Sequence, residues 1–130
     1  MKHALVIGGT RGIGEGVVDV LLREGWRVTA TGISRAEVDA FKASYSDAKA
    51  EVLDVTNQDQ VTQVFAGIDK LHGLVNCAGI LMRGQEYDID VFARVIDVNL
   101  TGTMRCCLAA QPLLSSQGGA IVNTASMLSY

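Results

Sequence analysis

The sequence predicts an α/β fold, a doubly wound parallel sheet with helices on both faces. Three observations lead to this fold class. Short β-branched runs alternate with segments of helical periodicity, each helical segment is long enough to connect two parallel strands, and a glycine-rich turn joins the first strand to the first helix. With 130 residues, 48% of them hydrophobic, the chain has the size and composition of one folded domain.

The predicted elements alternate regularly along the chain. In order, they are a strand at 4–7, a helix at 14–24, a strand at 27–31, a helix at 34–45, a strand at 50–53, a helix at 56–66, a strand at 73–76, a helix at 88–110 and a strand at 120–124. The first strand is a continuous apolar run, as expected of a parallel strand covered on both faces. Because each return to a parallel strand needs a helical connection, this order gives one parallel sheet.

The ends of the helices carry recognisable signals. Gly25 follows the first helix, where a helix stop is expected. Ser34 and Glu37 have the spacing of a capping box for the second helix, and Thr56 is expected to cap the third. Pro112 is expected just beyond the end of the longest helix. The apolar face of that helix is formed by Phe92, Val95, Ile96, Leu100 and Met104.

Composition and charge exclude several classes of protein. A formal charge of −3, with Lys and Arg scattered along the chain, argues against nucleic acid or an anionic membrane as a partner. No apolar run is long enough to span a bilayer, and the apolar start is too short for a signal peptide, so we expect a cytoplasmic protein. The three cysteines and two histidines lack metal-ligand spacing, so no metal site is expected.

The glycine-rich turn at 8–14 carries the strongest functional signal. Gly8 permits a tight exit from the strand, Gly12 lets the backbone approach a diphosphate, and Gly14 lets the helix pack closely on the sheet. The first-turn amides and the helix dipole then favour a bound phosphate. The alternative is a glycine-rich turn that binds no ligand.

The spacing of these glycines, Gly-x-x-x-Gly-x-Gly, resembles that of the short-chain dehydrogenase/reductase family, with Ile7 where the family usually has Thr. The resemblance implies a Rossmann-type sheet in strand order 3-2-1-4-5 and a bound dinucleotide, NAD or NADP. The implied cofactor-binding residues of this turn are Gly8, Thr10, Arg11, Gly12, Ile13 and Gly14.

Two further stretches resemble the cofactor site of the family. Asp54 and Val55 end the third strand, where the family has an Asp that contacts the adenine ring; the alternative is an Asp that caps a loop or helix. Asn76, Ala78 and Gly79 match the family's Asn-Asn-Ala-Gly motif, with Cys in its second position.

Two residues are implied to take part in catalysis. Asn99 lies on or beside the apolar face of the long helix, where the family's Asn interrupts the helix and holds a water of a proton relay. Ser126 follows the fifth strand and matches the family's Ser that orients the substrate oxygen. The alternatives are a hydrogen-bonded core Asn and a Ser that merely ends a strand.

The family's Tyr-x-x-x-Lys acid–base pair does not occur in the 130 residues, and Tyr130, only four positions after Ser126, is rejected as the catalytic acid. The family's last two strands and following helices are also absent. We therefore expect residues 1–130 to be a single NAD(P)-binding Rossmann domain, incomplete at its C-terminus and part of a longer polypeptide, with an exposed fifth strand. The alternative is a natural short form of the family.

The cofactor expectation favours NADP over NAD. Residues 31–35, at the end of the second strand, contain no acid to bind the ribose hydroxyls. Arg11 matches a position that is often basic in NADP-preferring relatives, and the nearby Arg35 could help to hold a 2′-phosphate.

Together, the resemblance implies an NAD(P)-dependent oxidoreductase that interconverts a secondary alcohol and a ketone. The expected partners are a small alcohol or ketone substrate and further copies of the chain, as a dimer or tetramer. One alternative is a non-catalytic dinucleotide-binding protein or partner subunit, and another is a purely structural fragment without nucleotide affinity.

Overall fold

The computed structural model describes residues 1–126. Within that range one sheet has five strands in the order β3-β2-β1-β4-β5, and every neighbouring pair is parallel. The predicted fold class and strand order are therefore confirmed. The strands are β1 (His3–Ile7), β2 (Arg27–Gly32), β3 (Lys49–Val52), β4 (Gly73–Asn76) and β5 (Ala120–Asn123).

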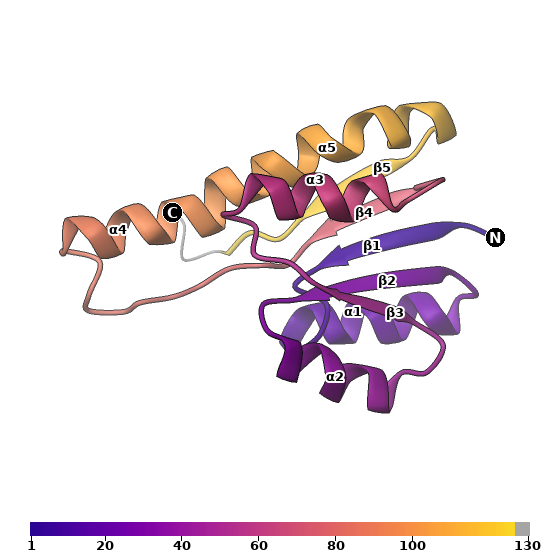
Figure 1. Ribbon diagram of the computed structural model, residues 1–130, viewed down its shortest axis with the longest axis horizontal. Helices are drawn as coiled ribbons and strands as arrows, with labels where there is room; N and C mark the ends of the chain where they lie inside the picture. Colours follow the sequence, from indigo (N-terminus) through magenta and orange to yellow (C-terminus); the bar gives the residue numbers. More distant parts are fainter. Residues whose placement is uncertain (127–130) are drawn as a thin grey trace.

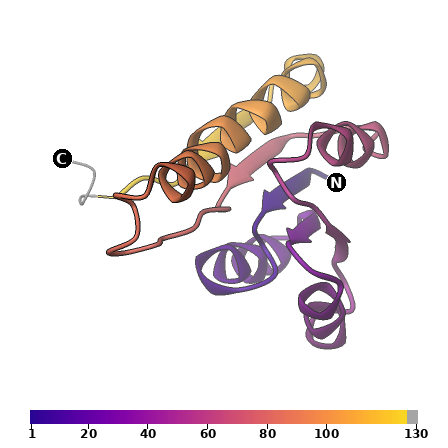
Figure 2. The same cartoon turned by 60° about the vertical axis from the view of Figure 1, so that its left-hand side comes forward.

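Helices cover both faces of the sheet. They are α1 (Gly12–Arg23), α2 (Arg35–Ser44), α3 (Gln58–Ala66), α4 (Ile89–Ile96) and α5 (Gly102–Gln117), with a π-helical segment, η1 (Asp97–Thr101), between the last two. Figures 1 and 2 show α1 and α2 on one face, α3 and α5 on the other, and α4 extending beyond the sheet. None of the helices within residues 1–126 is long and apolar enough to cross a bilayer.

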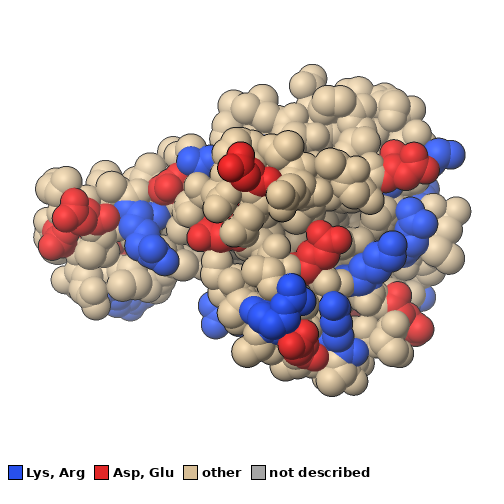
Figure 3. Space-filling view, viewed as in Figure 1, with Lys and Arg blue, Asp and Glu red and all other residues tan. Residues whose placement is uncertain are grey.

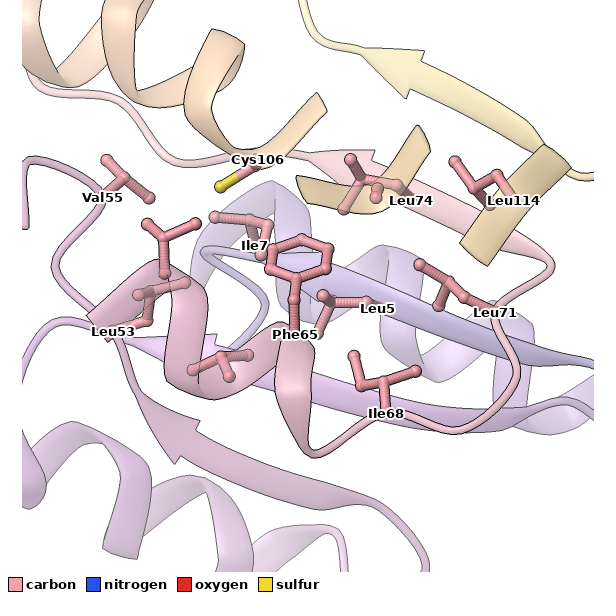
Figure 4. Close-up of a cluster of buried hydrophobic side chains, with 13 residues drawn as sticks. Leu5, Ile7, Leu53, Val55, Phe65, Ile68, Leu71, Leu74, Cys106 and Leu114 are labelled. Atoms are coloured by element: carbon pink, nitrogen blue, oxygen red, sulfur yellow. The ribbon is translucent and has the colours of Figure 1, made fainter. Parts of the chain in front are cut away.

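Each face of the sheet has its own apolar core. Figure 4 shows the core between the sheet and helices α3 and α5, in which Leu5 and Leu74 of the sheet meet Phe65 of α3 and Leu114 of α5. Leu5 and Leu74 are completely buried, and such a side chain stabilises a fold by about 1.5–3 kcal/mol. The second core lies under α1 and α2 and includes Val18. The central strands are thus fixed from both sides.

His3 begins β1 at the amino ends of the strands, opposite the glycine turn, and its ring is hydrogen-bonded on both sides. Its Nδ1 donates to the carbonyl oxygen of Lys70 at 3.1 Å, because that oxygen can only accept. Its Nε2 then accepts from the hydroxyl of Thr29 at 2.8 Å. Desolvation by burial is the largest effect on this imidazole and lowers the pKa of His3 below its usual value.

The start of the third helix differs from the sequence prediction. The third helix is capped by Asn57, whose side chain accepts from the backbone N–H of Gln60, and not by Thr56. Thr56 donates instead to Asp54, so its hydroxyl is used in the preceding loop.

The predicted single helix at 88–110 is wrong in its extent. It is divided by η1, and α5 continues through Pro112 to Gln117. Pro112 is tolerated because α5 is fixed by packing on both sides of it, by the buried Ala110 and Leu114. The helix stops only at Gly118, which takes a left-handed conformation (φ 65°).

The side of the molecule formed by β5 and the α4–α5 region is poorly covered. All four residues of β5 are exposed. Large apolar side chains on the predicted apolar face of the long helix also reach solvent, among them Phe92 at 51% and Leu100 at 64% exposure. This face is turned away from the core, because α5 packs on the sheet through a different set that includes Cys106.

Candidate functional site

A cavity of about 530 Å³ opens at the carboxyl edge of the sheet. Its volume falls within the range of small-molecule and cofactor sites. It is lined by the glycine turn, by the residues that follow β2, β3 and β4, and by part of α4 and η1: Ile7, Gly8, Arg11, Gly12, Ile13, Gly14, Thr31, Gly32, Ile33, Glu37, Leu53, Asp54, Val55, Cys77, Ala78, Gly79, Ile80, Arg94 and Val98. The structure therefore brings most of the sequence-predicted cofactor residues to one place.

Glycine occupies each of the three positions of the turn for a different structural reason. Gly8 has a φ of 74°, and a Cβ there would lie 2.8 Å from the backbone nitrogen of Ala78. A Cβ on Gly14 would collide with the carbonyl group of Gly8, so this glycine lets α1 approach the end of β1. Gly12 has a φ of 59°, but a Cβ there would meet no atom within 4 Å. Gly12 therefore faces open space at the cavity.

The N-terminus of α1 points a partial positive charge at this space. Arg11 is the N-cap residue, and its side chain makes no capping hydrogen bond. The first-turn amides of a helix have no intrahelical partners, and the helix dipole favours an anion beside them. The turn and the helix together are therefore suited to a phosphate group.

Asp54 lies at the cavity but also has a structural role. Its Oδ1 accepts from the backbone N–H of Thr56 at 2.9 Å and from the Thr56 hydroxyl at 2.7 Å. Its own N–H donates to the side chain of Gln60 at 2.8 Å. A carboxylate can accept further hydrogen bonds, so the loop-capping role and a contact to a ligand in the cavity are compatible.

Two of the predicted cofactor residues, Thr10 and Asn76, do not line the cavity. Asn76 is 3% exposed, and its Nδ2 donates to Oδ1 of Asn123 at 2.8 Å, joining β4 to β5. Its Oδ1 has no hydrogen-bond partner within residues 1–126. The next residue, Cys77, does line the cavity, and partial burial raises the pKa of its thiol.

Thr10 is buried and its hydroxyl donates to Oε1 of Glu37 at 2.6 Å. The Nε of Arg11 lies 3.6 Å from the same oxygen. Sequence reasoning identified Glu37 only as a helix cap and missed its position at the cavity. Thr31 and Ile33 line the cavity and lie in the stretch 31–35 that sequence reasoning placed at the ribose, but it missed Arg94, which carries no motif.

Asn99 lies in η1, outside the cavity lining. Its Oδ1 accepts from the N–H of Ile80 at 2.8 Å, and its Nδ2 donates to the carbonyl oxygen of Ile80 at 2.9 Å. The amide thus ties the loop after β4 to the interrupted helix. A Cβ on Gly79 would lie 3.3 Å from Oδ1 of Asn99, which favours a small residue there.

Ser126 follows β5 at the carboxyl edge of the sheet and is exposed. It is not part of the cavity lining. Tyr130, which the sequence reasoning rejected as the catalytic acid, lies outside the described residues.

The surface charges are mixed. On the face shown in Figure 3, basic and acidic side chains are interspersed and form no continuous basic stripe. Within residues 1–126, no three His, Cys, Asp or Glu side chains lie close enough together to hold a metal ion.

Comparison with known proteins gives consistent matches. The family model described as short chain dehydrogenase matches residues 2–130. The chain is 34% identical to an uncharacterized oxidoreductase, YxbG, of Bacillus subtilis, over 97% of this chain and 50% of the relative. It is 35% identical to a 3alpha-hydroxysteroid dehydrogenase of Mediterraneibacter gnavus, over 98% of this chain and 56% of that protein.

The fold also matches solved structures. A variant of the actinorhodin polyketide ketoreductase, solved with NADPH, has a TM-score of 0.88 and 25% sequence identity, covering 96% of this chain and 53% of that one. The chain spans about half the length of the relatives it matches.

Proposed function

Because the chain belongs to the short-chain dehydrogenase/reductase family, we propose that it supplies the dinucleotide-binding part of an NAD(P)-dependent oxidoreductase that interconverts a secondary alcohol and a ketone. The observation that carries this proposal is the cavity at the carboxyl edge of the sheet, with Gly12 open toward it. Ligands of open parallel sheets bind at this edge. A side chain at position 12 would enter the cavity beside the glycine turn, whereas glycine leaves room for a diphosphate.

The residues at the cavity fit the parts of such a cofactor. The first-turn amides of α1, at Gly12, Ile13 and Gly14, would bind the diphosphate. The Asp54 carboxylate would accept from the exocyclic amine of adenine, beside the apolar Val55. Ala78 and Gly79 leave space for the rest of the nucleotide, and Asn76 fixes the end of β4 through its hydrogen bond to Asn123 of β5. The choice between NAD and NADP depends on the charges around Arg11.

The nicotinamide, when bound, supplies or accepts the hydride. Ser126 would hydrogen-bond the substrate oxygen as its charge changes during the reaction. Asn99 would hold the loop after β4 against the interrupted helix and support a proton-relay water. The Tyr-x-x-x-Lys pair of the family is absent from the 130 residues and would be supplied by sequence beyond them.

We also propose a small alcohol or ketone as the substrate and a homo-oligomer as the working form. A relative at 35% identity is named as a hydroxysteroid dehydrogenase, which supports a secondary alcohol as the reacting group. The exposed apolar side chains of α4 and α5 support the homo-oligomer, because a large apolar surface is usually buried against another protein chain.

The test is turnover by the intact protein. A panel of secondary alcohols, hydroxysteroids included, is incubated with NAD⁺ or NADP⁺, and the absorbance of the reduced nicotinamide is followed. Ser126→Ala is expected to lower kcat by about 100-fold while leaving the dinucleotide Kd unchanged. Dinucleotide binding without turnover of any alcohol or ketone would favour the non-catalytic alternative. Loss of both would contradict the dinucleotide site itself.

A further inference from the structure

The carboxylate of Glu37 is turned away from its own helix. The Oγ of Ser34 accepts from the N–H of Glu37 at 3.2 Å, which is half of a capping box. In a complete capping box, the glutamate side chain would return to the N–H of the capping residue. Here it reaches 27 positions back along the chain, and Oε1 accepts from the Thr10 hydroxyl at 2.6 Å.

This carboxylate is fixed at the wall of the cavity. The Thr10 hydroxyl donates to its Oε1, and the Arg11 Nε approaches the same oxygen at 3.6 Å. The side chain of Glu37 is only 20% exposed, whereas that of Arg11 is 77% exposed. A Cβ on Gly32, at the end of β2, would collide with Thr10, so no side chain from that position can displace the contact.

From this arrangement we infer that Glu37 determines cofactor choice and makes the protein prefer NAD to NADP. The inference rests on the proposed dinucleotide site. An acid beside the adenosine ribose accepts from its hydroxyls, whereas a 2′-phosphate needs a cation. Both Thr10 and Arg11 approach Oε1, and within residues 1–126 no partner is seen for Oε2, which can accept from a ribose hydroxyl.

The same contacts weaken the case for NADP that the sequence suggested. Arg11 is paired with a carboxylate that would lie close to a bound 2′-phosphate and repel it. Arg35 is not part of the cavity lining, and its guanidinium lies 4.0 Å from the carboxylate of Asp39, one turn further along α2. Arg11 and Arg35, the two residues that the sequence suggested for a 2′-phosphate, therefore each have an acidic neighbour.

The experiment measures the Kd of NADH and of NADPH for the intact protein by titration calorimetry. Wild type is expected to bind NADH at least about tenfold more tightly than NADPH. Glu37→Gln keeps an oxygen for the Thr10 hydroxyl but removes the charge. It should tighten NADPH binding by about tenfold and change the NADH Kd by less than about threefold. Asp39→Asn is the matched control on the same helix and should leave both Kd values unchanged.

The outcomes separate this inference from the proposed function. If neither cofactor binds wild type, the dinucleotide site is contradicted. If both bind but NADPH binds as tightly as NADH or more tightly, the site stands and the inference about Glu37 is overturned. An equal gain in NADPH affinity for Asp39→Asn would also overturn it, because the removal of any negative charge on α2 would then explain the effect. The wild-type ratio decides the preference even if Glu37→Gln fails to fold.

Discussion

The substitution Gly12→Ala tests the phosphate-binding role of the glycine turn separately from its role in the fold. A methyl group there meets no protein atom within 4 Å, so the structure gives it no steric clash. It does force a non-glycine residue to a φ of 59°, which costs about 1–2 kcal/mol. The methyl group also enters the space that a diphosphate would occupy. We therefore expect a modest loss of stability and at least a tenfold weaker dinucleotide Kd, about 1.4 kcal/mol.

Two other glycines of α1 provide the comparison. Gly14→Ala places its methyl group against the backbone of Gly8, which cannot yield as a flexible side chain would. We expect it to destabilise the protein by about 3 kcal/mol or more. Gly16→Ala adds a methyl group to open space within the helix. It should stabilise by about 0.5–1 kcal/mol, because alanine loses less backbone entropy, and it should leave cofactor binding unchanged.

The assay combines denaturant unfolding with cofactor titration for all three variants of the intact protein. We expect Gly12→Ala to weaken binding by at least about tenfold with only a modest loss of stability. Gly14→Ala should lose more stability than Gly12→Ala, because its methyl group meets the backbone of Gly8. A Gly12→Ala variant with wild-type affinity would show that the diphosphate does not bind beside Gly12. So would a Gly16→Ala variant that binds as weakly as Gly12→Ala.

Three further predictions concern other parts of the chain. Because burial lowers the pKa of His3, the unfolded chain binds a proton more readily, and unfolding free energy should fall as pH drops below about 6.5; denaturation at several pH values should give a flatter dependence for His3→Gln, and an unchanged slope would contradict this. Asn99→Ala loses both hydrogen bonds to Ile80 and should destabilise by about 1 kcal/mol in denaturant melts, with Asn99→Asp in between; a variant as stable as wild type would show that the bonds do not matter. Burial raises the pKa of Cys106 to about 12, so alkylation followed by mass spectrometry should find it protected in the folded protein while the half-buried Cys107 reacts; equal rates would contradict the burial.

The sequence predicted the fold well because its signals are local. The apolar strands, the helical periodicity and the glycine turn each depend on residues that are close in the chain. The helix caps show the limit of such signals. Ser34 was identified as a cap correctly, but the destination of the Glu37 side chain depends on Thr10, which only tertiary structure brings near.

The errors in the long helix have the same origin. Proline usually ends a helix, yet Pro112 lies inside α5, because packing against the sheet outweighs the local preference. Asn99 was recognised from its polar character beside an apolar stripe. Its partner Ile80, 19 positions away, could not be read from that pattern.

A crystal structure of the intact protein with its bound dinucleotide would show whether the glycine turn at 8–14 holds the diphosphate. We expect diphosphate oxygens within hydrogen-bond distance of the backbone N–H groups of Ile13 and Gly14, with Gly12 beside them. A diphosphate bound elsewhere, or a turn at 8–14 that stays closed to the nucleotide, would contradict it.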